Sequence, residues 1–138
     1  MTSDEFRALM DRLARGWSTQ DTELALSCFT EHAVYMEPPD VQLYLGHPEL
    51  RPYFAALTPG TYLRLHTVAF DERAQAGAAE YSFGSEGEAT ADHGVAVVEL
   101  DGDRIAFWRE YQRKGPASFP DFVARDGKTW HWHIGNYP

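Results

Sequence analysis

The predominant periodicity of apolar residues changes at Gly60, and this change constrains the fold more than any other feature. Before Gly60, apolar residues recur every three or four positions, which is typical of amphipathic helices. After Gly60 they alternate with polar residues, which is typical of half-buried strands. Helices early and strands late predict an α+β fold, in which helices pack on an antiparallel sheet.

Three helices are expected in the first part of the chain. Thr2 and Glu5 have the form of a capping box ahead of a helix over residues 3–16. Asp21 can cap a second helix, and a third opens at Gly46 and ends before a Thr-Pro-Gly turn signal. The apolar stripe of the second helix comprises Leu24, Ala25, Cys28 and Phe29.

Four successive strands are expected after Gly60, separated by short polar turns. They cover residues 61–70, 75–84, 91–100 and 103–114. Asp101-Gly102 is the clearest hairpin signal among these turns. A further strand over 33–37 lies between the second and third helices. A curved sheet wrapped around three helices leaves a cone-shaped cavity between the two layers, and such a cavity is the default ligand site.

The 138 residues are expected to form one domain with a variable tail at 115–138, because 43% hydrophobic residues suffice for a core. The tail contains one strand candidate, at 129–134. His131 and His133 share a face of that strand, but no further ligands follow at a recognisable spacing. We therefore expect neither a metal nor a cofactor, and a strand whose tryptophans cover the sheet or the cavity mouth is the favoured alternative.

The charge of the chain excludes several classes of partner. The 21 Asp and Glu residues outnumber the 12 Lys and Arg residues, and the formal charge of -9 would repel phosphate backbones and anionic membranes. Neither nucleic acid nor a membrane is expected as a partner. With Cys28 as the single cysteine, no internal disulfide can form. No signal peptide or membrane span is recognisable, so we expect a cytoplasmic protein.

The stretch Ala-Val-Tyr-Met-Glu-Pro-Pro, residues 33–39, places acid chemistry at the end of a strand. In an extended segment Tyr35 and Glu37 share one face, and the prolines that follow must stop the strand. If that face is turned inward, a carboxylate lies beside a phenol in an apolar setting. The alternative is that Glu37 has already reached solvent.

Two stretches of the sequence carry a resemblance to a known family. ALSCFTEHAVYMEPP and VVELDGDRIAFWREYQ, together with the order of elements, resemble the nuclear transport factor 2-like superfamily, and within it the SnoaL-like group. That group contains polyketide cyclases, ketosteroid isomerases and limonene epoxide hydrolases. The resemblance covers residues 3–114 and implies a cystatin-like cone, whose curved antiparallel sheet wraps around the N-terminal helices.

The resemblance implies roles for three residues. Glu37 occupies the position of the general base of the isomerases, just before the proline that ends the first strand. In the epoxide hydrolases a tyrosine and an asparagine on this strand hold the attacking water; Tyr35 matches the first and Glu37 replaces the second. The Trp-Arg-Glu-Tyr stretch places Glu110 where the hydrolases have a catalytic aspartate.

The chain also departs from the family's known sites. Tyr81 and Phe83 stand where the hydrolases have an arginine and an aspartate, so their epoxide-protonating relay is lost. Leu13 and Ala96 stand at the oxyanion-hole positions of the isomerases. Asp92, four residues before Ala96 on the same strand face, is a candidate for the cavity mouth.

We therefore interpret the chain as a small-molecule enzyme that binds a hydrophobic, cyclic substrate in the cone. Glu37 is the candidate base, Tyr35 its hydrogen-bonding partner, and Glu110 or Asp92 the acid. The residues expected to form the apolar wall are Trp17, Tyr81, Phe83 and Trp108. The alternative is a non-catalytic ligand-binding or dimerisation module on the same fold, in which the acids are structural.

Single residues also leave alternatives open. Glu110 can instead pair with an arginine or face solvent, and Tyr35 can simply pack its ring under the third helix. Cys28 is expected in the core, and His66 is expected to be a partly buried strand histidine. The resemblance also implies a homodimer formed through the sheet.

Overall fold

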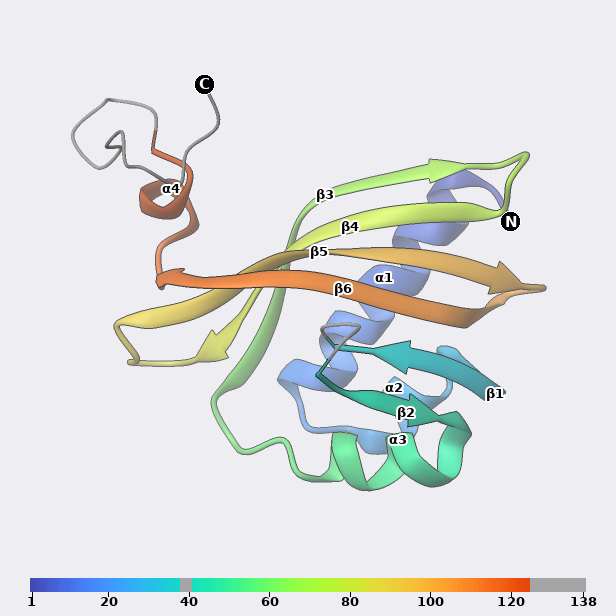
Figure 1. Ribbon diagram of the computed structural model, residues 1–138, viewed down its shortest axis with the longest axis horizontal. Coiled ribbons are helices and arrows are strands. Elements are labelled where there is room, and N and C mark those ends of the chain that lie inside the picture. The colour runs from blue at the N-terminus through green and yellow to red at the C-terminus, as the bar shows by residue number, and fades with distance from the viewer. Residues whose placement is uncertain (38–40, 125–138) are drawn as a thin grey trace.

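The two periodicities of the sequence form two layers in the computed structural model, which describes residues 1–37 and 41–124. The helices are α1 (Ser3–Ser18), α2 (Thr22–Leu26), α3 (Gly46–Ala55) and α4 (Phe119–Phe122). The strands are β1 (Phe29–Met36), β2 (Leu43–Leu45), β3 (Thr61–Asp71), β4 (Ala76–Ser85), β5 (Thr90–Asp101) and β6 (Arg104–Pro116). Figure 1 shows their arrangement, which confirms the predicted α+β fold.

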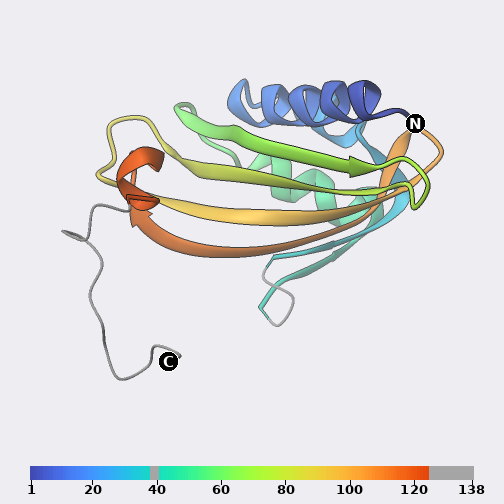
Figure 2. The same cartoon turned by 90° about the horizontal axis from the view of Figure 1, so that it is seen from above.

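All six strands belong to one curved sheet, in the order β2-β1-β6-β5-β4-β3. The pairs are antiparallel except for β1 and β6, which run parallel. Figure 2 shows α1 and α3 together on one side of this sheet. We call the sheet face toward these helices the inner face. The core between the layers is rich in aromatic side chains, including Phe6, Trp17, Phe29, Tyr35, Phe54, Tyr81 and Trp108.

Both hydrogen bonds of the predicted capping box are present at the start of α1. The backbone N–H of Glu5 donates to Thr2 Oγ1 at 3.3 Å, and the backbone N–H of Thr2 donates to Glu5 Oε2 at 2.7 Å. These bonds satisfy two of the N–H groups that the first helical turn leaves free. The helix continues two residues beyond the predicted end, to Ser18.

The second helix is shorter than its apolar stripe suggests. It ends at Leu26, and Phe29 begins β1 instead of continuing the helix. Both Cys28 and Phe29 are nevertheless buried in the core, as their apolar character requires. Apolar residues in a short run do not distinguish the end of a helix from the start of a buried strand.

The four long strands lie within two residues of their predicted bounds, and Gly102 turns the β5–β6 hairpin with a positive φ of 63°. Two elements were not predicted. Strand β2 has only three residues, and α4 has four, so neither carries a periodic signal. The strand candidate at 129–134 lies outside the described residues. None of the helices in the described part of the chain is long and apolar enough to cross a membrane.

Candidate active site

The parallel pairing of β1 with β6 brings two carboxylates together. Tyr35 pairs with Trp108 and Met36 with Arg109, so the next positions on the two strands are Glu37 and Glu110. Neighbouring strands lie about 4.8 Å apart, and residues at alternate positions share a face. Glu37 is 8% exposed and Glu110 is 2% exposed. Both predicted acids therefore turn inward, and the solvent-exposed alternative is excluded for each.

Glu110 receives two hydrogen bonds on one carboxyl oxygen. Trp108 Nε1 donates to Glu110 Oε2 at 2.7 Å, and the Tyr35 hydroxyl donates to the same oxygen at 3.3 Å. Burial, followed by the negative charge of Glu37, raises the pKa of Glu110 to about 8, although the hydrogen bonds oppose this rise. At neutral pH Glu110 therefore holds a proton for most of the time.

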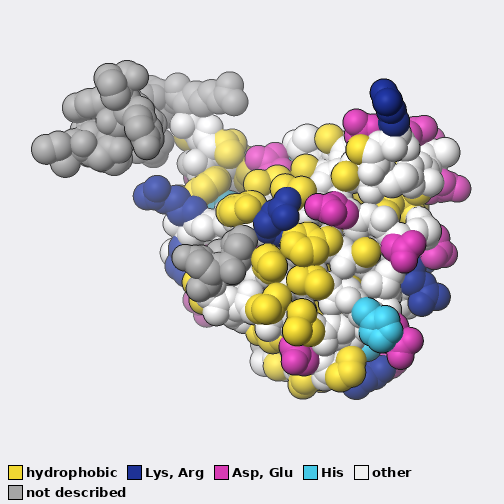
Figure 3. Space-filling model, turned by 45° about the vertical axis from the view of Figure 1, so that its right-hand side comes forward, with side chains coloured by type: hydrophobic (Ala, Val, Ile, Leu, Met, Phe, Trp, Pro, Cys, Tyr) yellow, Lys and Arg dark blue, Asp and Glu magenta, His cyan; other side chains and the backbone are white. Residues whose placement is uncertain are grey.

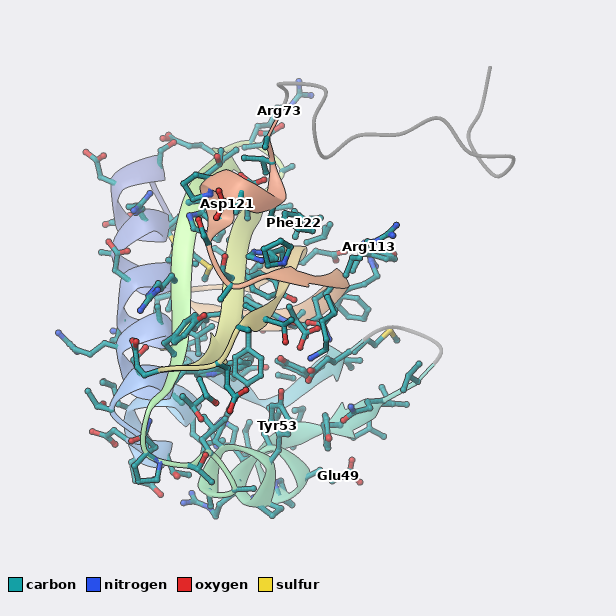
Figure 4. The ribbon with its side chains drawn as sticks, turned by 90° about the vertical axis from the view of Figure 1, so that its left-hand side faces the viewer. Glu49, Tyr53, Arg73, Arg113, Asp121 and Phe122 are labelled. Carbon is teal, nitrogen blue, oxygen red and sulfur yellow. The ribbon has the colours of Figure 1, made fainter. Side chains whose placement is uncertain are left out.

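Glu37 is fixed by a residue of α3. The Tyr53 hydroxyl donates to Glu37 Oε2, and the backbone N–H of Glu37 donates to the carbonyl oxygen of Gln42 at 3.1 Å. The hydroxyl oxygens of Tyr53 and Tyr35 lie 3.5 Å apart. Figure 4 shows Tyr53 rising from α3 toward the strands. We call the row Glu37, Tyr53, Tyr35 and Glu110 the carboxylate-phenol chain.

Both phenols of the carboxylate-phenol chain, Tyr35 and Tyr53, keep their protons at physiological pH. Burial raises the pKa of Tyr35 and of Tyr53 well above the ordinary value. The adjacent carboxylate, Glu110 for Tyr35 and Glu37 for Tyr53, raises each pKa further. The two tyrosines therefore act as hydrogen-bond donors and are not sources of negative charge.

Aromatic rings surround the carboxylate-phenol chain. Trp108 stacks on Tyr35, with ring centroids 5.8 Å apart and an 8° angle between planes. Trp17 meets Phe83 edge to face at 5.3 Å, and the Trp17 indole N–H is buried without a hydrogen-bond partner among the described residues. The Tyr81 hydroxyl donates to Gln112 Oε1 at 3.1 Å. Burial, with a smaller contribution from Glu110, also raises the pKa of Tyr81.

Asp92 is not brought together with the other acids. It pairs with Lys114 of β6, whose Nζ lies 3.3 Å from Asp92 Oδ2, and its side chain is 25% exposed. Along β5 it is four residues from Ala96, the partner of Glu110, which is about 13 Å in an extended strand. Asp92 lines a separate hollow of about 330 Å³ with Phe83 and Lys114.

The hydrogen-bond partners differ from those predicted within the site. Tyr35 donates to Glu110 and not to Glu37, because Glu110 lies beside it on β6 while Tyr53 already occupies Glu37. The Tyr35 ring also packs against Phe54 of α3, so Tyr35 both donates a hydrogen bond within the site and packs its ring against the third helix. Tyr53 is not among the predicted site residues. Its place one residue before the apolar Phe54, in the predicted third helix, is the signal that could have identified it as inward-facing.

Leu13 and Ala96, which the resemblance aligns with the oxyanion-hole positions of the isomerases, are buried. Within residues 1–37 and 41–124 there is no group of three or more metal-ligating side chains. His131 and His133, the two histidines that share a face of the predicted terminal strand, lie outside the described residues.

Comparison with known proteins places this geometry in a family. A family model described as a SnoaL-like domain matches residues 10–108, which is most of the chain. The chain belongs to the SnoaL-like family. The match ends two residues before Glu110, so the family model itself does not include the second acid. A comparison with curated proteins finds no significant match.

Solved structures with the same fold include a protein of unknown function and proteins described as enzymes of different classes. A protein of unknown function with a cystatin-like fold from Methylobium petroleophilum is 17% identical, with a TM-score of 0.73, and covers 100% of this chain and 98% of its own. The epoxide hydrolase/cyclase-like enzyme SalBIII is 16% identical, with a TM-score of 0.70, covering 80% and 94%. A putative ketosteroid isomerase from Kribbella flavida is 14% identical, with a TM-score of 0.68, covering 88% of both. At these identities the likeness establishes the fold alone.

Proposed function

We propose that this SnoaL-like domain is an enzyme that binds a hydrophobic, cyclic small molecule beside Glu37 and Glu110 and transforms it by acid–base catalysis. The observation that carries the proposal is the buried pair of carboxylates, in which one member has a pKa raised to about 8. Two carboxyl groups in different environments can divide the roles of acid and base between them. The surrounding aromatic rings suit an apolar substrate.

Each member of the pair has a distinct role. Glu37 removes a proton from the substrate or from an attacking water, and Glu110, which is protonated at neutral pH, returns a proton to the developing negative charge. After this step Glu37 is protonated and Glu110 is ionised. The same division supports isomerisation, cyclisation or hydrolysis, so the class of the substrate decides the reaction.

The two tyrosines offer a path that resets the pair. When Glu37 carries the proton, it donates to the Tyr53 oxygen, Tyr53 donates to Tyr35, and Tyr35 donates to ionised Glu110. A shift of each proton by one position neutralises Glu110 and ionises Glu37 again. No proton needs to be exchanged with solvent during this reset.

A non-catalytic ligand-binding module is the second candidate. It is favoured by the fact that Tyr53, Tyr35 and Trp108 already donate hydrogen bonds to the two acids. A network that satisfies itself can serve to specify the packing of β1 against β6. The apolar Leu13 and Ala96, which the resemblance aligns with the oxyanion-hole positions of the isomerases, favour the same candidate.

Replacement of the base distinguishes the two candidates. The wild type and Glu37→Gln are assayed against a panel of hydrophobic cyclic ketones and epoxides, with Glu99→Gln, on the exposed outer face, as the matched control. We expect Glu37→Gln to fold normally and to lose any turnover by at least about 100-fold, while Glu99→Gln retains it. Equal turnover in Glu37→Gln and the wild type would remove Glu37 from the role of base.

We also propose that two copies of this chain pair through the outer face of the sheet. Large apolar side chains exposed there include Leu43, Leu45, Val95 and Tyr111. Figure 3 shows apolar side chains gathered on one face of the molecule. Contiguous exposed apolar surface of this kind is typical of an interaction site. A second copy supplies a complementary apolar surface, because the same patch recurs on it.

A further inference from the structure

A second buried polar cluster lies on the opposite face of the sheet from the acids. Ser82 of β4 stands between two histidines: its Oγ is 2.7 Å from His66 Nε2 and 2.7 Å from His93 Nδ1. The other ring nitrogen of His93, Nε2, is 2.7 Å from the carbonyl oxygen of Pro116. Ser82 is 2% exposed and His93 is 3% exposed. We call His66, Ser82 and His93 the histidine-serine cluster.

The hydrogen bonds determine where the protons of this cluster lie. A carbonyl oxygen only accepts, so His93 Nε2 must carry a hydrogen and donate to Pro116. In neutral His93 the Nδ1 atom is then an acceptor, and the Ser82 hydroxyl donates to it. The Ser82 oxygen in turn accepts from His66 Nε2, which carries a hydrogen. When both histidines are neutral, every bond is satisfied in one arrangement only.

The cluster accommodates one additional proton but not two. If His93 is protonated, its Nδ1–H donates to Ser82, and the Ser82 hydroxyl rotates to donate to His66 Nε2, after the hydrogen of neutral His66 has moved to Nδ1. If His66 is protonated instead, the original arrangement persists. With both histidines protonated, the Ser82 hydrogen loses its acceptor and two cations face each other across one oxygen, which is costly for a buried group.

Helix α4 is held on the outer face by this cluster. Phe119 stacks on His66 with ring centroids 3.5 Å apart, and Phe122 stacks on His93 at 4.1 Å. Gly115 makes room for this packing, because a Cβ atom there would lie 2.4 Å from the Phe122 ring. Figure 4 shows Phe122 beneath α4, against the strands. The contacts of α4 therefore depend on the positions of the two imidazole rings.

Other charged groups around the cluster do not supply a second neutralising partner. Glu80 lies on the same outer face and lines a hollow with His93, and its charge favours one protonated histidine. Arg64 is directed to Glu86, at 2.6 Å. Arg113, the neighbour of His93 on β6, is exposed and extends away from α4 in Figure 4. Asp121 of α4 is also exposed. Tyr111 lines the same hollow.

We propose that the histidine-serine cluster is a one-proton switch that releases α4 from the sheet when the solution is acidified. Release of α4 removes the Phe119 and Phe122 rings that stack on His66 and His93, so the two imidazoles can turn away from Ser82 and both be protonated, whereas the docked helix tolerates one proton on the pair. The released state therefore binds one more proton at low pH, and acidification favours it.

The pH range follows from the ordinary titration of histidine. Free histidines have a pKa of about 6.5, so the difference in bound protons develops as the pH falls below about 6. Burial lowers the pKa of His66, which acts in the same direction. Docking is then complete above this range and is lost as the pH falls through it. One proton limits the change in the docking equilibrium to about tenfold per pH unit.

Release of α4 would enlarge an apolar hollow on the outer face. This hollow has a volume of about 420 Å³ and a floor of small residues, Ala69, Ala78 and Gly94. Phe119 and Phe122 form part of its wall in the docked state. The switch therefore controls access to apolar surface that lies away from the two catalytic carboxyl groups.

The test uses the full chain and nuclear magnetic resonance between pH 5.5 and 8. The ¹⁵N spectra of the imidazole rings report tautomer and protonation, and the Phe119–His66 ring contacts together with the Val123 amide report docking of α4. We expect neutral Nε2–H tautomers at pH 8, and a ratio of docked to released molecules that falls by as much as about tenfold per pH unit below pH 6.

Two variants make the test specific. His66→Gln retains donor and acceptor atoms beside Ser82 but cannot be protonated, so we expect docking in it to be independent of pH. His32→Gln, an exposed histidine on β1, serves as the matched control and retains the response of the wild type. Docking that is constant across this range in the wild type, or an unchanged response in His66→Gln, would overturn the proposal.

Discussion

At the scale of single residues, Glu37 and Glu110 differ because their donors and burial differ. Glu110 is the more deeply buried and receives an indole N–H, whereas Glu37 receives a phenol from α3. A hydrogen bond to a carboxylate stabilises the ionised form, and burial destabilises it. The raised pKa of Glu110 shows that burial outweighs the hydrogen bonds at this site.

Removal of the indole donor is expected to raise the pKa of Glu110 further. Trp108→Phe keeps an aromatic ring beside Tyr35 but deletes the hydrogen bond from Nε1 to Glu110. A hydrogen bond to a charged group contributes about 1.5–3 kcal/mol, which corresponds to about one to two pKa units. Carboxyl ¹³C titration of the wild type and the variant measures the change. An unchanged or lower pKa in Trp108→Phe would contradict this account of the site.

The raised pKa of Glu110 also predicts how stability depends on pH. The folded state keeps the proton up to about pH 8, while the unfolded chain loses it near the ordinary value of about 4.3. The folded state therefore binds more protons between these values, and the free energy of unfolding falls as the pH rises, by at most about 1.4 kcal/mol per pH unit. Glu110→Gln should flatten this dependence in urea titrations, whereas Glu99→Gln should not. A slope that persists in Glu110→Gln would mean that another group causes it.

At the scale of elements, the sequence determined the long pieces well and the short pieces poorly. Residues 61–114 alternate clearly enough to place four strands, and the capping box places α1. Strand β2 forms because β1 offers it a partner, not because three residues prefer a strand. Helix α4 likewise depends on the histidine rings beneath it. Such elements exist through their tertiary contacts, and these contacts leave no periodic signal in the sequence.

The contact between α1 and α2 gives a prediction at this scale. A Cβ atom on Gly16 would lie 2.8 Å from the backbone nitrogen of Ala25, which cannot easily move. We expect Gly16→Ala to lower the free energy of unfolding by about 1–3 kcal/mol, as overpacking does. Urea denaturation measures the difference. A gain of about 1 kcal/mol, as for an exposed helical glycine, would show that the two helices can separate at little cost.

At the scale of the whole molecule, the sequence predicts which residues of each strand share a face of the site, but it does not predict which strands are neighbours. Alternation along each strand placed Tyr35 with Glu37 and Trp108 with Glu110, and these pairings of face are present. The parallel neighbours β1 and β6 could not be derived from alternation, because it does not tell which strands meet. The partner of Tyr35 and the role of Tyr53 both depend on that missing information.

The exposed outer face gives the prediction for the whole molecule. If two copies pair through it, Tyr111→Glu should convert a dimer into a monomer, because a charge replaces a half-exposed aromatic ring at the interface. Ala55→Glu, on the exposed side of α3, should remain dimeric. Size-exclusion chromatography with light scattering gives the mass of each species. A monomeric wild type would refute the proposed pairing.

The pairing of β1 with β6 also determines at which stage of biosynthesis the site can form. Tyr35 and Glu110 are 75 positions apart, and Glu110 lies on β6, the last strand of the sheet along the chain. Contacts so distant along the chain form late and slowly. A nascent polypeptide that has emerged only as far as β5 thus contains Glu37 but not Glu110. The raised pKa of Glu110 is acquired only when β6 closes the sheet against β1.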